Sequence, residues 1–151
     1  MAVALLDSSA IVAYLVADDA LHESAAQALE STLSRGGALV MSAVTWNETL
    51  YGALLGHLPE GALRELARDF GIDILPVDQA VAEQAAILQR AYRGSRRSAP
   101  KPRLRTPDAL ILATALVHTE IDTIVAGDAQ WQKVPGIDAD IVLLSERRES
   151  R

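Results

Sequence analysis

Short apolar runs alternate along the chain with stretches of helical periodicity. Runs of four to six residues rich in Val, Ile, Leu and Ala predict buried strands, and they lie at residues 3–6, 38–41, 72–77, 123–126 and 141–144. Between these runs, apolar residues recur at spacings of three and four, which predicts helices. One helix is expected after Asp7 and one from near Ala20, and the others span about 42–55, 59–71, 78–92 and 106–118.

Residues that favour helix ends mark several of these boundaries. Ser, Thr and Asp offer side-chain oxygens to the free amides of a first turn, proline suits the first helical position, and glycine ends helices. The residues expected to act in this way are Ser8 or Ser9, Ser42, Pro59, Gly71, Asp78, Thr106 and Pro107.

Strands that alternate with helices need crossover connections, and such connections join parallel strands. We therefore predict an α/β fold with a mainly parallel central sheet of about five strands and helices on both faces. A length of 151 residues suits one domain. Residues 1–145 are expected to form this domain, and residues 146–151 a charged C-terminal tail.

The composition excludes several kinds of chemistry and indicates where in the cell the protein acts. The chain has no cysteine, so disulfides, thiolate nucleophiles and cysteine-based zinc sites are excluded. The apolar start carries no Lys or Arg before Asp7, unlike a signal peptide, and no window is long and apolar enough to cross a bilayer. We expect a soluble cytoplasmic protein without a membrane segment.

Two aspartates follow predicted strands. Asp7 comes directly after the first strand, and Asp128 follows the fourth strand and Gly127. In open parallel sheets, ligands bind beyond the carboxyl ends of the strands, so both side chains are expected at that edge. A single Asp more commonly serves as a turn residue or helix cap, and this alternative stands for each aspartate taken alone.

Two further carboxylates lie in predicted helices. Glu48 shares a helical face with Val44, Tyr51 and Leu55, and a carboxylate that points with such a face toward a core needs a partner or a metal. Asp108 lies in the first turn of a helix that is apolar on all sides, which indicates a buried helix. The alternatives are a half-buried Glu48 that pairs with an arginine or water, and an Asp108 that only complements the helix dipole.

The four carboxylates carry more information as a set. Two carboxylates about 4 Å apart repel by about 4 kcal/mol at an effective dielectric of 20, so a convergent set needs protons or a cation. Oxygen ligands without cysteine or clustered histidine favour Mg²⁺ or Mn²⁺. We predict a catalytic and metal-binding set of Asp7, Glu48, Asp108 and Asp128. Ser8 is an auxiliary candidate for orienting a ligand, with helix capping as its alternative.

A basic segment precedes Asp108. It has six positive charges with no acidic residue between them: Arg93, Arg96, Arg97, Lys101, Arg103 and Arg105. Subtracting these six from 14 basic residues leaves 8 against 20 acidic residues, a balance of −12 for the rest of the chain. We expect an irregular loop that holds the phosphates of a polyanionic substrate near the metal. A solvated loop, or a contact for an acidic partner, explains the charges equally well.

The motifs together resemble the PIN domain, and specifically the VapC-type toxins of bacterial toxin–antitoxin pairs. The resemblance covers residues 3–144. It rests on Asp7-Ser8-Ser9 after the first strand, on Ser42, Thr45 and Glu48 at spacings of three, on residues 106–115 around Asp108, and on Asp128 with Trp131 three residues on. The family often has Thr or Ser two residues before the fourth Asp, where this chain has Ala126.

The resemblance implies cleavage of RNA with Mg²⁺ or Mn²⁺, a homodimer, and a cognate antitoxin that blocks the active site. It implies that Asp7, Asp108 and Asp128 hold a divalent ion and that Glu48, with Asp108, positions a second ion or the attacking water. We therefore predict a divalent-metal-dependent endoribonuclease, the toxin of a type II toxin–antitoxin system.

Two other functions stay open at this point. A PIN-like protein that binds RNA or a partner without cutting is the main alternative. An α/β phosphatase with Asp7 as nucleophile is the second, although such enzymes have an Asp two residues on, where this chain has Ser9. The chain has no G-x-S-x-G elbow, P-loop or dinucleotide-binding glycine motif.

Overall fold

The central element of the computed structural model, which describes residues 1–94 and 103–146, is a five-stranded sheet. All four strand pairings are parallel, and the strand order is β3-β2-β1-β4-β5. The strands are β1 (Val3–Leu6), β2 (Ala38–Ser42), β3 (Asp73–Leu75), β4 (Thr123–Ala126) and β5 (Asp140–Leu143). The predicted α/β fold with a parallel sheet is confirmed.

Six α-helices and one short 3₁₀ helix connect the strands in the described chain. They are α1 (Ser8–Leu15), α2 (His22–Ser34), α3 (Ala43–Leu54), α4 (Glu60–Asp69), α5 (Gln79–Arg93), α6 (Thr106–Val117) and the 3₁₀ helix η1 (Ala129–Lys133). In the described parts of the chain, no helix is long and apolar enough to cross a membrane. Residues 147–151 of the predicted charged tail lie outside the described residues.

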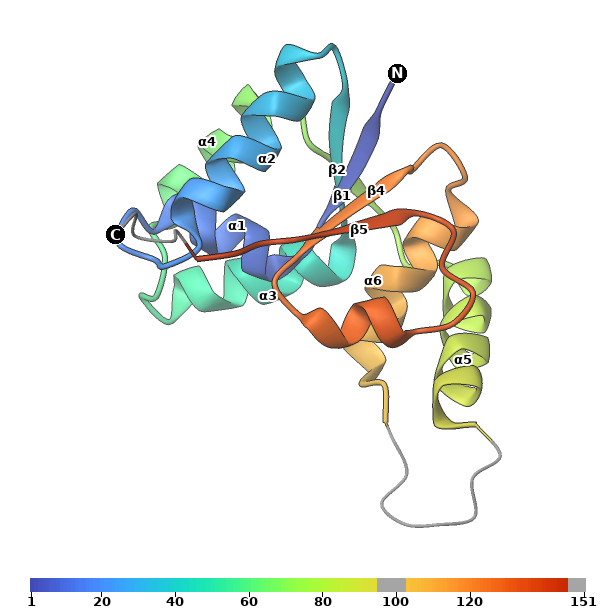
Figure 1. Cartoon of the computed structure of the whole chain (residues 1–151). Helices are drawn as coiled ribbons and strands as arrows, with labels where there is room; N and C mark the ends of the chain where they lie inside the picture. Colours follow the sequence, from blue (N-terminus) through green and yellow to red (C-terminus); the bar gives the residue numbers. More distant parts are fainter. Residues whose placement is uncertain (95–102, 147–151) are drawn as a thin grey trace.

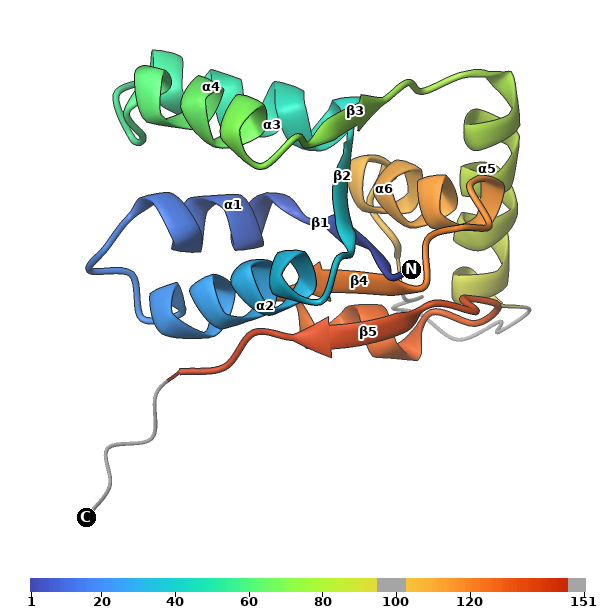
Figure 2. The ribbon, with the colours of Figure 1, turned by 90° about the horizontal axis from the view of Figure 1, so that it is seen from above.

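The sheet is covered by helices on both faces, as predicted. Figures 1 and 2 show α5 and α6 on one side of the strands and α1 and α2 on the other. Alternate residues of β1 serve the two cores: Val3 and Leu5 pack with residues of α5 and α6, and Ala4 and Leu6 pack with residues of α1, α2 and α4. Because both faces are buried, the strands read as continuous apolar runs.

The strand order places a switch point between β1 and β4. The chain adds β2 and β3 on one side of β1 and then returns to add β4 and β5 on the other side. In doubly wound sheets, ligands bind outside the carboxyl ends of the strands at such a switch point. The backbone amide of Asp7 still donates to the carbonyl of Val125 at 2.9 Å, so the two strands stay paired up to the candidate residue.

Two helix caps were predicted correctly and others were wrong. Ser42 and Asp78 cap α3 and α5, accepting hydrogen bonds from the amides of Val44 and Val81. Asp7, not Ser8 or Ser9, occupies the N-cap position of α1, because that helix already begins at Ser8.

The other differences are shifts of one or a few residues. Pro59 is the N-cap residue of α4 and not its first helical residue. Thr106 is the first residue of α6, whose N-cap is Arg105. The third strand covers three of the six predicted residues, because this edge strand pairs with β2 over three positions only.

Candidate acidic site at the carboxyl edge of the sheet

The two strand-end aspartates follow β1 and β4, which are neighbouring strands, a pairing that the sequence did not specify. Asp7 follows β1 and is buried, with 8% of its surface exposed. Asp128 follows β4 after one glycine and is exposed, and its Oδ1 accepts a hydrogen bond of 2.9 Å from the amide of Gln130. Since β1 and β4 are adjacent and parallel, the turns that carry these aspartates share one edge of the sheet.

The two helical carboxylates come from segments that pack against each other. Glu48 is half-buried in α3, the helix that starts at the carboxyl end of β2. Asp108 is half-buried in the first turn of α6, where the helix dipole favours a negative charge. Helices α3 and α6 contact each other and both contact β2, which brings the two side chains toward the same edge.

Electrostatic interactions link the four side chains in pairs. The pKa of Asp7 is raised from 3.8 to about 6: burial is the largest cause, the charges of Asp108 and Glu48 add to it, and hydrogen bonds from Ser9 and the Ser8 backbone oppose it. Burial also raises the pKa of Asp108; Arg105 opposes this shift, and the charges of Asp128 and Glu48 add to it. Asp108 therefore interacts with all three other carboxylates, which makes it the common neighbour of the set.

The donor set fits a divalent cation chemically, although it is not closed around one point. Within residues 1–94 and 103–146, no group of three or more acidic or histidine side chains is arranged to hold a metal ion. Each donor is a carboxylate oxygen, the ligand type that Mg²⁺ and Mn²⁺ prefer. Burial is the main cause of the raised pKa values of Asp7 and Asp108, and repulsion between carboxylates adds to it; a bound cation would relieve that repulsion.

Two neighbouring serines engage two different carboxylates. The hydroxyl of Ser8 donates to Oε1 of Glu48 at 2.7 Å, and the hydroxyl of Ser9 donates to Oδ2 of Asp7 at 2.8 Å. The sequence predicted that Ser8 or Ser9 caps α1, but both hydroxyls bind carboxylates instead. The sequence carried no signal for the Ser8–Glu48 pairing, because the two residues are 40 positions apart.

The face of α3 that carries Glu48 does not point into the core. Tyr51 and Leu55 share that face in sequence, and the structure leaves 63% and 54% of their surfaces exposed. The sequence-based expectation of an inward-facing apolar helix surface was therefore wrong for this half of α3. Leu54, at 68% exposed, adds to the exposed apolar residues at this end of α3. We call Tyr51, Leu54 and Leu55 the α3 patch.

Only the ends of the predicted basic loop are described. Arg93, Arg103 and Arg105 are exposed, whereas Arg96, Arg97 and Lys101 lie outside the described residues. Arg105 is close enough to Asp108 for its charge to lower the pKa of that carboxyl group. At least one member of the predicted substrate-binding set therefore lies beside the acidic site.

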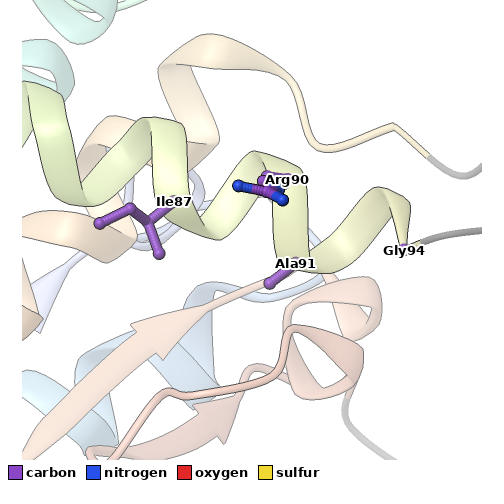
Figure 3. Close-up of a pocket in the computed structure, with 4 residues that line it drawn as sticks. All are labelled: Ile87, Arg90, Ala91 and Gly94. Atoms are coloured by element: carbon purple, nitrogen blue, oxygen red, sulfur yellow. The ribbon is translucent and has the colours of Figure 1, made fainter.

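A hollow of about 510 Å³ lies along α5, away from the carboxylates. Its described lining consists of Ile87, Arg90, Ala91 and Gly94, which recur along one face of the helix (Figure 3). None of the four carboxylates belongs to this lining. The hollow is therefore not the candidate site.

Residues on the opposite, inner side of α5 form hydrogen bonds to the segments that carry Asp108 and Asp128. Nε2 of Gln89 donates to Oγ1 of Thr106 at 3.1 Å, at the start of the helix that bears Asp108. The hydroxyl of Tyr92 donates to Oε1 of Gln130 at 3.4 Å, next to Asp128. These contacts connect one helix to both turns of the acidic site.

The sheet and its acidic edge define a doubly wound α/β protein with four carboxylates gathered beyond the strand ends. A family model described as the PIN domain matches residues 4–137. The chain belongs to the PIN-domain family, which confirms the resemblance found in the sequence.

Three solved structures with a similar fold come from toxin and toxin–antitoxin proteins. A toxin–antitoxin complex from Klebsiella pneumoniae contains a chain with 27% identity and a TM-score of 0.68, and the match covers 95% of this chain and 99% of that one. VapBC2 from Rickettsia felis, bound to a promoter DNA fragment, has 13% identity and a TM-score of 0.68 over 95% of this chain and 99% of that one.

A third similar structure is VapC20 from Mycobacterium tuberculosis, a toxin that cleaves the sarcin-ricin loop. It has 19% identity and a TM-score of 0.64, with 91% of this chain and 98% of that chain covered. Curated proteins gave no match. The likeness to the Rickettsia and Mycobacterium proteins concerns the fold alone.

Proposed function

We propose that this protein is a divalent-metal-dependent endoribonuclease and the toxin of a type II toxin–antitoxin pair. The observation that carries the proposal is the electrostatic coupling of the carboxylates. Four acidic side chains from four separate segments interact at the switch point of the sheet, and Asp108 interacts with each of the others. Membership of the PIN-domain family and the likeness to toxin–antitoxin proteins support the same function.

In this proposal the four carboxylates have different roles, which follow from their positions. Asp7, Asp108 and Asp128 would hold Mg²⁺ or Mn²⁺, and Glu48, with Asp108, would position a second ion or the attacking water. When bound, a divalent ion supplies an activated water near neutral pH and stabilises charge on the phosphoryl oxygens. Ser8 orients Glu48 through its hydrogen bond of 2.7 Å, which fixes one carboxylate oxygen, and among the described residues the other oxygen has no hydrogen-bond partner.

The experiment that tests this function measures cleavage of a synthetic RNA with Mg²⁺, with Mn²⁺ and with a chelator. Asp108→Asn should abolish cleavage and leave the circular dichroism spectrum unchanged, because the substitution removes the charge but keeps the side-chain shape. Asp73→Asn, an exposed aspartate at the start of β3, is the matched control and should retain full activity. A well-folded Asp108→Asn protein with normal activity contradicts the proposal.

The same assay distinguishes the proposed nuclease from a PIN-like protein that binds RNA without cutting it. A protein that binds RNA without cutting would retain the intact RNA in a filter-binding experiment with Mn²⁺ and would release no product. In that case the acidic residues serve a binding site only. Cleavage that is lost with the chelator and restored by Mn²⁺ rules this alternative out.

We further propose that the exposed ends of the basic loop contact RNA phosphates. The support is the position of Arg105 beside Asp108 and the exposure of Arg93 and Arg103. For single-stranded nucleic acid, each phosphate contact contributes about 0.7 to the slope of log affinity against log salt concentration. Replacing Arg93, Arg103 and Arg105 by Gln should lower that slope by about 2, and an unchanged slope contradicts this role.

We propose that an antitoxin chain covers the α3 patch. Tyr51, Leu54 and Leu55 are exposed apolar residues, and Tyr51 lies one helical turn from Glu48, so a chain that covers the patch would reach the edge of the acidic site. Tyr51→Ser with Leu55→Ser should weaken inhibition by the antitoxin without reducing cleavage of free RNA. Equal inhibition of the parent and the double variant contradicts this docking site. The predicted homodimer and cytoplasmic location stay predictions; light scattering tests the dimer.

A further inference from the structure

Ser9 joins two segments of the acidic site that are far apart in the sequence. Its hydroxyl donates to Oδ2 of Asp7 at 2.8 Å and accepts from the backbone amide of Gly127 at 2.9 Å. Gly127 lies 118 positions away and immediately precedes Asp128. One hydroxyl therefore uses its donor and its acceptor to connect the end of β1 with the turn after β4.

Gly127 provides the space for this contact. A Cβ atom at position 127 would lie 3.1 Å from Oγ and 3.2 Å from Cβ of Ser9. The backbone of Gly127 does not have a positive φ, so conformational freedom does not explain the glycine. The close approach of the Ser9 side chain does, because any larger residue would displace it.

The hydrogen bond between Ser9 and Gly127 lies just beyond the last backbone hydrogen bond between β1 and β4. The amide of Asp7 pairs with the carbonyl of Val125, and the next link on this side of β4 is the hydrogen bond from Gly127 to Ser9. Ala126 contributes no hydroxyl, and Asp128 itself binds forward to the amide of Gln130. Ser9 is thus the side chain that relates the carboxylate of Asp7 to the turn of Asp128.

We propose that Ser9 is a positioning residue that fixes Asp7 and the Gly127–Asp128 turn relative to each other. Ser9 acts through its two partners and does not need to touch substrate. The consequence for metal binding and cleavage rests on the proposed function. Partners that orient metal ligands typically change metal affinity by about 10–100-fold when they are removed, and we expect an effect of this size for Ser9.

The test compares Ser9→Ala, Ser9→Thr and Ser8→Ala by amide hydrogen exchange and Mn²⁺ titration. In Ser9→Ala, the amide of Gly127 loses its acceptor and should exchange roughly tenfold faster, and Mn²⁺ affinity should fall by about 10–100-fold. Ser9→Thr keeps the hydroxyl and should restore both values. Ser8→Ala is the matched control, because Ser8 binds Glu48 and the exchange of Gly127 should stay as in the parent.

Exchange and metal affinity together separate positioning from a merely structural role. An unchanged Gly127 exchange rate in Ser9→Ala overturns the proposal, and so does faster exchange with unchanged Mn²⁺ affinity. A lower melting temperature that Ser9→Thr restores without restoring Mn²⁺ affinity also overturns it. If the parent protein binds no Mn²⁺, the nuclease proposal fails, and the exchange rates alone decide whether Ser9 links the two segments.

Discussion

Asp7→Asn should stabilise the protein at neutral pH and have no such effect in acid. The pKa of Asp7 is raised from 3.8 to about 6, so the folded protein binds a proton more tightly than the unfolded chain does. The difference of about 2 pKa units corresponds to about 3 kcal/mol, at 1.36 kcal/mol for each unit. Because the folded pKa is the higher one, stability is fully present below pH 3.8 and is lost as the pH rises through 6. Asparagine carries no charge and avoids this loss.

The assay is urea unfolding at pH 4 and at pH 8 with a chelator present. The free energy of unfolding of Asp7→Asn should exceed that of the parent by about 3 kcal/mol at pH 8 and match it at pH 4. The side-chain oxygen of asparagine can still accept the hydrogen bond from Ser9, which keeps the comparison close. Asp18→Asn, at an exposed turn residue, is the control, and its difference in stability from the parent should be the same at both pH values. Equal stability of Asp7→Asn and the parent at pH 8 refutes the reasoning.

Two further substitutions test packing around the site. Gly127→Ala should cost about 1–3 kcal/mol in unfolding free energy because its Cβ would crowd Ser9, whereas Gly61→Ala, in open space on α4, should add about 0.5–1 kcal/mol; equal effects in thermal unfolding would contradict the close approach. Thr45→Val should stabilise the protein by about 1 kcal/mol, since Oγ1 of Thr45 is buried without a hydrogen-bond partner in the described structure; a loss of stability in urea would show that this hydroxyl has a partner.

The sheet could be predicted from the sequence because its strands are buried on both faces. Leu5 and Leu6 point to opposite sides of β1 and are both fully buried, so the run contains no polar position that would blur the strand pattern. The edge strands were predicted less well. β3 pairs on one side only and is mostly exposed. The length of this strand is therefore fixed by its three pairings with β2 and not by the length of the apolar run in the sequence.

The α3 patch shows the limit of apolar periodicity as a sign of burial. Tyr51 and Leu55 recur with Glu48 at helical spacing, and the pattern predicted a face that packs inward. The structure buries Thr45, Thr49 and Ala53 instead, on a different face of the same helix. Periodicity reports that a helix has an apolar face, but a face that meets a partner chain and a face that meets the core produce the same pattern.

The acidic site was predictable for a topological reason, and its serines were not. Parallel strands joined by crossovers must end at one edge, so residues that follow strands, such as Asp7 and Asp128, are brought together by the connectivity itself. The direction of a serine hydroxyl depends on which acceptor lies nearest in space. The hydroxyl of Ser9 donates to the buried carboxylate of Asp7 and accepts from an amide 118 positions away, and the local sequence around Ser9 contains no sign of the second partner. Carboxylates that gather at the edge of a sheet thus offer strong acceptors to neighbouring hydroxyls, and these pairings follow from the tertiary fold and not from the local sequence.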